Sequence, residues 1–312
     1  MTDITIAVCI LFYERVEQTV ECISSFLPSG VPVYVLNNGS SRAAAKILRE
    51  FCTLHKRIKI LDSAVNLGIG VGRNRLISGT TEKWLVFVDN DIIMKTHDWL
   101  YRIKRHIKMD SSVEAFIPRL YNVHENRYAI RNSLKLINNK VAHNEITGGE
   151  TNWFPGGAAF VRRQLFDRLG LYDDQLFASL EDYELAIRGI REGHPVRAKV
   201  VSDIILIHDH RRVRGDNDRD AVSTRYDLGS IEKSFKRIKE KHNIEFKYRW
   251  SIKLWSITAA GRMAGEKRPF LEMIAHALRK AVAVRAEIRS FFVSPFSFLK
   301  HLRSTSEGKR WR

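Results

Sequence analysis

The stretch WLVFVDND, residues 84–91, decides the fold of this chain. Its first five residues, Trp84–Val88, form an apolar run that is typical of a strand buried on both faces of a sheet. Asp89, Asn90 and Asp91 then end the run with residues that favour turns. Taken alone, this tripeptide is more typical of a plain strand end. Its two carboxylates also suit Mg²⁺ or Mn²⁺, which take hard oxygen ligands together with substrate phosphates.

The residues before this stretch alternate between strand-like and helix-like patterns. The strand-like segments are Ile4–Phe12, Val31–Leu36 and Ile58–Leu61, and the helix-like segments are Val16–Leu27, Ala43–Phe51 and Gly72–Ile77. Strands and helices in turn predict βαβ units and a mostly parallel sheet flanked by helices. Ligands of such sheets bind at the carboxyl ends of the strands, where Asn37–Ser40 and Asp89–Asp91 fall.

The residues after Asp91 show a less regular pattern. Asn138 and Asn139, between the segments Leu134–Ile137 and Val141–His143, predict a hairpin. The other predicted elements are strands at Ala115–Pro118, Ala158–Arg162 and Val200–Ile207, and helices at Gln164–Leu169 and Leu180–Arg191. The charged segment Arg211–Asp220 reads as a loop.

Residues 66–74, NLGIGVGRN, place glycines at alternate positions ahead of a predicted helix. Such a stretch lets the backbone approach a phosphate or a base closely, and Arg73 can neutralise an anion. It does not satisfy the dinucleotide fingerprint, because Arg75 stands where the third glycine belongs. A dehydrogenase is therefore disfavoured.

Ser179-Leu180-Glu181-Asp182 opens the last of these predicted helices. As a capping box, it would use Ser179 as the N-cap and Asp182 at the third helical position. As a catalytic element, a carboxylate at a rigid helix start would act as a general base toward a hydroxyl group. The local sequence does not decide between these readings.

Two further motifs carry the same ambiguity. Pro155-Gly156-Gly157 is either an ordinary tight turn or a place where a ligand comes close to the backbone. His208 and His210 stand at the end of a predicted strand. Each alone is more typical of a surface histidine than of a metal ligand.

The order of these motifs resembles that of the inverting glycosyltransferases of family 2, which have the GT-A fold and use nucleotide-sugar donors. The resemblance covers about residues 4–212 and is nearest to the rhamnosyltransferase-like enzymes of cell-surface glycans. It implies an α/β fold with a Rossmann-like sheet. It also implies a nucleotide-sugar-binding half at 1–95, an acceptor-binding and catalytic half at 96–215, and a basic, mainly helical C-terminal region at 216–312.

On the donor side, the resemblance implies roles for residues at the strand ends. Tyr13 and Asn38 would line the nucleobase pocket, with Arg73 at its edge. Asp89 would face the ribose, and Asp91 with Asp89 and His208 would hold Mn²⁺ or Mg²⁺ on the diphosphate, with His210 in reserve. The full donor-binding set is Tyr13, Asn38, Gly70, Arg73, Asp89, Asn90, Gly156 and Gly157.

On the acceptor side, Asp182 matches the general base of the family and Glu181 lies beside it. Gly156 and Gly157 match the turn beneath the sugar and the acceptor. The sequence departs from the family at two places: Asn37 and Asn38 stand where an Asp is common, and Phe12-Tyr13-Glu14 replaces Thr-Tyr-Asn. Both departures leave the nucleobase open.

The formal net charge of +17 is concentrated near the C-terminus. Residues 232–312 hold 20 Lys+Arg against 7 Asp+Glu, out of 52 and 35 in the chain. Large apolar residues between Trp250 and His301 alternate with the cations, which is typical of a helix on an anionic membrane surface and equally of a helical subdomain packed on the body. The three cysteines show no ligand spacing and suit a reducing cytosol.

The sequence therefore predicts a cytoplasmic enzyme, with the inner face of the cell membrane as a place of peripheral attachment. Its partners would be a nucleotide sugar and a glycan or lipid-linked acceptor, with no specific nucleic acid. Two alternatives stay open. The basic region could serve a nucleic-acid-binding protein, although no recognised nucleic-acid motif is present. The fold could also serve as a catalytically silent module that binds nucleotide sugars.

Overall fold

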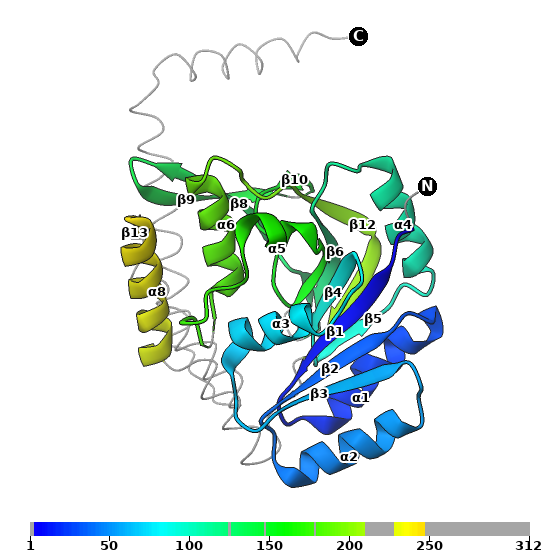
Figure 1. Cartoon of the computed structure of the whole chain (residues 1–312). Helices are drawn as coiled ribbons and strands as arrows, with labels where there is room; N and C mark the ends of the chain where they lie inside the picture. Colours follow the sequence, from blue (N-terminus) through cyan, green and yellow to red (C-terminus); the bar gives the residue numbers. More distant parts are fainter. Residues whose placement is uncertain (1–2, 124–125, 147, 178, 210–227, 247–312) are drawn as a thin grey trace, which may run out of the picture. The chain divides into compact units, whose positions relative to one another are not determined.

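A computed structural model of the chain describes residues 3–123, 126–146, 148–177, 179–209 and 228–246. They form an α/β fold with a ten-stranded mixed sheet flanked by helices and a small three-stranded sheet (Figure 1). Among these residues, no helix is long and apolar enough to cross a membrane.

One half of the large sheet is parallel, as predicted. Its strands lie in the order β3 (Ile58–Ser63), β2 (Val33–Asn38), β1 (Ile6–Phe12) and β4 (Trp84–Asp89). The helices α1 (Val16–Phe26) and α2 (Arg42–Thr53) bury apolar residues against one face, and α3 (Gly68–Ser78) buries Leu76 and Ile77 against the other. All four carboxyl ends therefore meet at one edge.

The other half of the sheet is mixed. β11 (Ala158–Arg162) runs antiparallel to β4, and β6 (Ala115–Asn122) runs antiparallel to β11 and parallel to β12 (Ala198–His208). The register pairs Ala158 with Val88, so the residues just before β11 lie beside Asp89. The remaining elements of this half are β5 (Ile92–Met94), β7 (Arg127–Tyr128), β10 (Gly149–Thr151), α4 (Trp99–Met109), α5 (Gln164–Leu169) and α6 (Glu181–Arg191).

The helix α3 begins at Gly68, four residues before the predicted start, so the glycine-rich stretch is helical and not a turn. Gly68 has a φ of 77°, and its N–H donates to the Asn66 side chain at 2.9 Å. A methyl group on Gly72 would lie 2.5 Å from the Leu11 side chain. The glycines thus let α3 pack directly on β1.

The second sheet consists of β8 (Arg131–Ile137), β9 (Lys140–Ile146) and β13 (Glu245–Phe246). Asn138 and Asn139 have φ angles of 49° and 59°, as a two-residue hairpin turn requires, so the hairpin prediction is confirmed. This sheet shares a buried apolar cluster with α6 and with α8 (Leu228–His242), to which α8 contributes Ile238. Consequently, α6 is covered from both sides.

Ion pairs fasten α8 to α6. The carboxylate of Glu184 is fully buried and accepts from Lys241 at 2.9 Å, from His242 at 2.8 Å and from Arg188. Asp173 accepts from Lys241 at 2.7 Å and from Arg237 at 3.2 Å. Three basic side chains of α8 therefore pair with the acids Asp173 and Glu184. The predicted loop 211–220 and the predicted amphipathic segment after Trp250 lie outside the described residues.

Candidate active site

The centre of the candidate site is Arg73, which α3 places at the carboxyl edge of the sheet. Its guanidinium is 5% exposed and donates to Asp89 Oδ1 at 3.1 Å and to the Glu181 carboxylate. Burial alone would lower the pKa of Arg73, but Glu181 and Asp89 outweigh it and raise that pKa. Arg73 therefore links the donor-side acid at the end of β4 to the acid pair at the start of α6.

The turn Gly156-Gly157 lies against these charged groups. A Cβ on Gly156 would collide with the Arg73 guanidinium and approach Glu181 Oε1 to 2.9 Å, and a Cβ on Gly157 would collide with the Asp89 carboxylate. The backbone also pairs here, because the Asp89 N–H donates to the Gly157 carbonyl at 3.0 Å. Both positions require glycine so that Arg73 and Asp89 can approach the backbone.

Asp182 does not cap its own helix. The residue before α6 is Leu180, with a φ of 74° and no side-chain cap, and the Ser179 hydroxyl is buried without a hydrogen-bond partner among the described residues. The capping-box reading is therefore wrong. Asp182 Oδ2 instead accepts the Gly156 N–H at 2.7 Å.

The environment of Asp182 suits a base that works near neutral pH. Burial and the neighbouring Glu181 carboxylate raise the pKa of Asp182 to about 7, against the opposing effects of the Gly156 N–H and Arg73. A general base is most effective when its pKa lies near the operating pH. Asp182 and Glu181 differ in their partners, since Glu181 is paired with Arg73.

Asp91 follows β4 and pairs with groups other than Arg73. It is 4% exposed, and its Oδ1 lies 3.1 Å from His208 Nε2 at the end of β12. Its Oδ2 accepts from Arg15 at 3.5 Å. The structure thus brings together two of the three predicted metal ligands, Asp91 and His208, while Asp89 is paired with Arg73.

The side chains at Asp91 fit a divalent metal ion whose coordination shell is completed by a bound ligand. Across the described ranges, no three His, Cys, Asp or Glu side chains are grouped as a metal site. One carboxylate and one imidazole suffice where donor phosphates complete the shell, which is how Mg²⁺ and related ions are commonly held. Asp91 and His208 would hold the ion, and His210 lies outside the described residues.

Two of the predicted donor residues, Asn38 and Asn90, hold the strand-end loops in place. Asn38 is buried, its side chain donates to Asn66 Oδ1 and to the Gly68 carbonyl, and it accepts from the Leu67 N–H at 3.0 Å. Asn90 donates to the Thr19 hydroxyl at 2.9 Å. Gly70 lies inside α3, where a Cβ would approach the Asp173 carbonyl to 3.1 Å. Tyr13 follows the end of β1 and is half-buried.

Sequence reasoning missed Glu14 and Arg15, which connect β1 to α1. Both have positive φ angles, 53° and 52°, which residues other than glycine seldom adopt. The Glu14 carboxylate accepts from the Ser41 N–H at 2.6 Å and from its hydroxyl, so Glu14 ties the loop after β2 to the loop after β1. The only signal in the sequence was a pair of charged residues directly after a buried strand.

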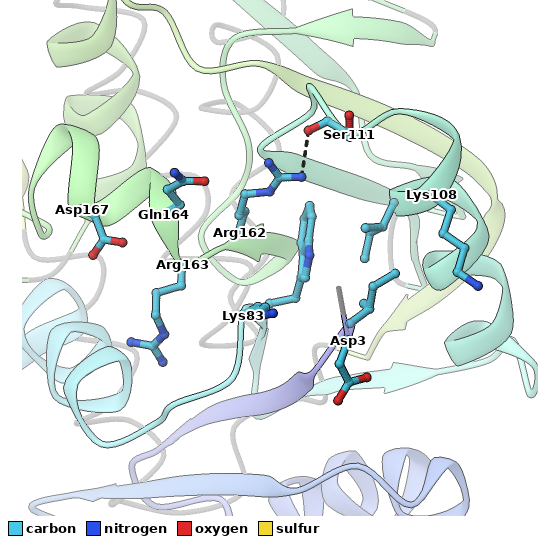
Figure 2. A pocket seen from close by; sticks show the side chains of 11 residues that line it. Asp3, Lys83, Lys108, Ser111, Arg162, Arg163, Gln164 and Asp167 are labelled. Atoms are coloured by element: carbon cyan, nitrogen blue, oxygen red, sulfur yellow. Dashed lines mark hydrogen bonds between the residues drawn. The ribbon is translucent and has the colours of Figure 1, made fainter. Parts of the chain in front are cut away.

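A separate cavity of about 800 Å³ lies at the opposite end of these strands (Figure 2). Its lining includes Lys83, Lys108 and Arg162, and Arg162 donates to the Ser111 carbonyl at 2.8 Å. Trp84, at the start of β4, also lines it, whereas Asp89 ends that strand at the candidate site. This cavity is therefore not part of the candidate site.

A family model described as Glycosyl transferase family 2 matches residues 7–170, which is just over half of the chain. The matched part includes the parallel half of the sheet, Arg73, Asp89–Asp91 and Gly156-Gly157. No curated protein matches the chain significantly.

Solved glycosyltransferases have a similar fold. A structure of GalNAc-T7 with UDP, GalNAc and Mn²⁺ has a TM-score of 0.55 and 15% identity over 83% of this chain, which spans only 58% of that protein. The mannosyltransferase PcManGT from Pyrobaculum calidifontis with GDP-Man and Mn²⁺ has a TM-score of 0.52 and 15% identity, over 90% of this chain and 80% of that protein. S. aureus TarS 1-349 has a TM-score of 0.52 and 16% identity, over 88% of this chain and 87% of that protein. At such identities, the likeness concerns the fold alone.

Proposed function

This chain belongs to glycosyl transferase family 2, and we propose that it moves a sugar from a nucleotide-diphosphate donor to a hydroxyl group of a glycan or lipid-linked acceptor, with inversion at the anomeric carbon. The observation that carries this proposal is the half-buried Asp182 carboxylate, which the Gly156 N–H holds at 2.7 Å beside the Arg73 cluster. Relatives in fold were solved with UDP, GDP-Man or UDP-GlcNAc.

Asp182 would perform the proton transfer. As the acceptor oxygen forms its bond to the anomeric carbon, Asp182 takes the hydroxyl proton, and the bond between that carbon and the diphosphate oxygen breaks. The electron pair of the broken bond leaves with the nucleoside diphosphate. Attack from the face opposite the leaving group inverts the configuration, and no covalent glycosyl-enzyme is needed. The Gly156 N–H fixes the direction of the carboxylate throughout.

The donor would lie along the ends of β1 and β4, with Asp89 toward the ribose and Tyr13 toward the base. Asp91 and His208 would hold a Mn²⁺ or Mg²⁺ ion, which supplies positive charge against the diphosphate. Arg73, a buried cation that pairs with both Asp89 and Glu181, offsets the repulsion between these two carboxylates. The Gly156-Gly157 backbone would lie beneath the sugar, with Arg73 and Asp89 packed against it.

The deciding experiment is a donor screen with the full chain. Nucleotide sugars based on uridine, guanosine and thymidine diphosphates are tested for thermal stabilisation with Mn²⁺, because a ligand bound only by the native state raises its apparent stability. Release of nucleoside diphosphate from the stabilising donor then measures activity. Metal-dependent stabilisation with hydrolysis or transfer supports the enzyme, and stabilisation without any turnover favours a silent binding module.

The acceptor would belong to cell-surface glycan synthesis at the inner face of the membrane, of the rhamnosyltransferase type among others. Residues 247–312 carry 15 Lys+Arg against 4 Asp+Glu, and such a segment is attracted to anionic lipids. The cations of α8 do not contribute to this attraction to the same degree, since Arg237, Lys241 and His242 are paired with Asp173 and Glu184.

A further inference from the structure

We infer that Arg15 is the internal counter-cation of Asp91 and makes a divalent metal ion and a nucleoside diphosphate bind cooperatively. The inference rests on the proposed function, because it assumes that Asp91 and His208 form the metal site. It assigns a task to a residue that no motif had singled out.

The first observation is the charge pairing at Asp91. The carboxylate is nearly inaccessible, and its two oxygens face different groups, His208 at 3.1 Å and Arg15 at 3.5 Å. The Arg15 side chain is itself only 8% exposed. A buried carboxylate requires a compensating charge, and Arg15 provides it from the loop that follows β1.

The second observation is that the backbone at Arg15 adopts an unfavourable conformation, which places its side chain beside Asp91. Glu14 and Arg15 are consecutive non-glycine residues in the left-handed region, which is unfavourable unless surrounding bonds impose it. Those bonds are present: the Glu14 N–H donates to the Ser40 hydroxyl at 3.1 Å, and the Arg15 carbonyl accepts from the Thr19 N–H and hydroxyl. Strain that is over-determined in this way tends to mark a functional position.

The third step concerns what happens when a metal ion arrives. A divalent cation on Asp91 would lie close to the Arg15 guanidinium, and the two positive charges repel strongly in a buried site. The metal ion alone therefore binds weakly. A nucleoside diphosphate brings negative oxygens that match the planar N–H fork of a guanidinium, so Arg15 exchanges its carboxylate partner for a phosphate. Metal and nucleotide each relieve the cost of binding the other.

The test measures this coupling directly in the full chain. Mn²⁺ binding is followed by the electron paramagnetic resonance signal of free Mn²⁺, alone and with UDP, GDP or dTDP, corrected for protein-free mixtures. Nucleotide binding is measured by calorimetry with and without Mn²⁺, because linkage requires the same coupling factor in both directions. In the unmodified chain, we expect the nucleotide to tighten Mn²⁺ binding by about tenfold or more.

Arg15→Gln should tighten the binding of Mn²⁺ alone and lower the coupling factor several-fold, to the part that direct contact between the phosphates and the metal supplies. Arg15→Lys keeps the positive charge but lacks the planar guanidinium, so its coupling factor should be intermediate. This variant also keeps the inference testable if Arg15→Gln fails to fold. Arg49→Gln is the matched control, since Arg49 is half-exposed and pairs with Asp62 far from the metal site. Unchanged coupling in folded Arg15 variants overturns this inference alone. Absence of Mn²⁺ binding with every nucleotide overturns the proposed metal dependence as well.

Discussion

The backbone N–H of Gly156 and the carboxylate of Asp182 are joined by a 2.7 Å hydrogen bond, although 26 residues separate them in the chain. The bond ties the turn before β11 to the start of α6. Because β11 runs antiparallel to β4, the same turn also lies against Asp89. One short turn therefore contacts both Asp89 and Asp182, the proposed donor-binding acid and the proposed general base.

Asp182→Asn should lower sugar transfer by about 10²–10⁴-fold, because the amide cannot accept the hydroxyl proton. Asparagine can still accept the Gly156 N–H through its oxygen, so nucleoside diphosphate binding should persist. Single-turnover transfer and calorimetric binding separate the two effects. Asp174→Asn, at an exposed neighbouring acid, is the control. Near-normal transfer by Asp182→Asn would refute the assignment of the base.

The transfer rate should rise with pH and level off above about 7. Asp182 works as a base only when ionised, and its pKa is raised to about 7 mainly by burial. A profile of kcat/KM against pH for the free enzyme reads this ionisation directly. A rising limb near pH 4, where an exposed carboxyl group titrates, would contradict the assignment of Asp182 as a base with a raised pKa.

The same pKa makes a prediction for stability. Because the pKa of Asp182 is higher in the folded state than its ordinary 3.8, ionising it costs stability as pH rises from about 4 to about 7. Asp182→Asn removes that cost. The Tm of the variant should exceed that of the unmodified protein above pH 7 by at least a few degrees, and the gain should vanish toward pH 4. A gain that does not depend on pH would contradict the shifted pKa.

Gly157→Ala should weaken donor binding by about tenfold, since the methyl group would push the Asp89 carboxylate from its place and disturb the pair with Arg73. Titration of nucleoside diphosphate in the presence of Mn²⁺ measures the effect. Gly148→Ala is the matched control, because a Cβ at Gly148 meets nothing within 4 Å. Equal affinities for the two variants would mean that Asp89 does not contact the donor.

Glu184→Gln should destabilise the fold by about 3 kcal/mol at neutral pH, as breaking a buried ion pair usually does. Burial opposes ionisation of Glu184, but hydrogen bonds from His242 and Arg188 outweigh it and lower its pKa to about 2. This stabilisation is present above about pH 4.5 and is lost as pH falls toward 2. Urea unfolding at several pH values measures it. Glu192→Gln, at the exposed end of the same helix, should change little.

Full-length protein should sediment with vesicles that contain anionic lipid, and a chain ending at residue 246 should not. The cut must follow residue 246, because Ile231, Ile238 and Ile244 are buried and β13 pairs with β9. Circular dichroism checks that the shorter chain is folded. Neutral vesicles are the control, and equal partition of both chains would contradict membrane binding through residues 247–312.

Much of the fold followed from local patterns. The apolar runs of β1, β2 and β4 predicted buried parallel strands, and Asn138-Asn139 predicted its hairpin, because both signals depend only on neighbours in the chain. The start of α3 was placed too late, since only packing on β1 shows that Gly68, Gly70 and Gly72 are helical. The capping box at Ser179 is absent because α6 begins after Leu180, whose φ of 74° makes Leu180, and not Ser179, the N-cap residue.

The sequence by itself determined the family, the α/β fold and the edge of the sheet where the acids gather, because strand ends and turns depend on residues that are neighbours in the chain. Only the tertiary structure decided the partners of those acids. Arg73 pairs with Asp89 and also with Glu181, which is 108 residues further along the chain from Arg73, and Arg15 meets Asp91 across 76 residues. Such pairings depend on the antiparallel placement of β11 and on strained loops. Charge and burial then assign a different task to each carboxylate.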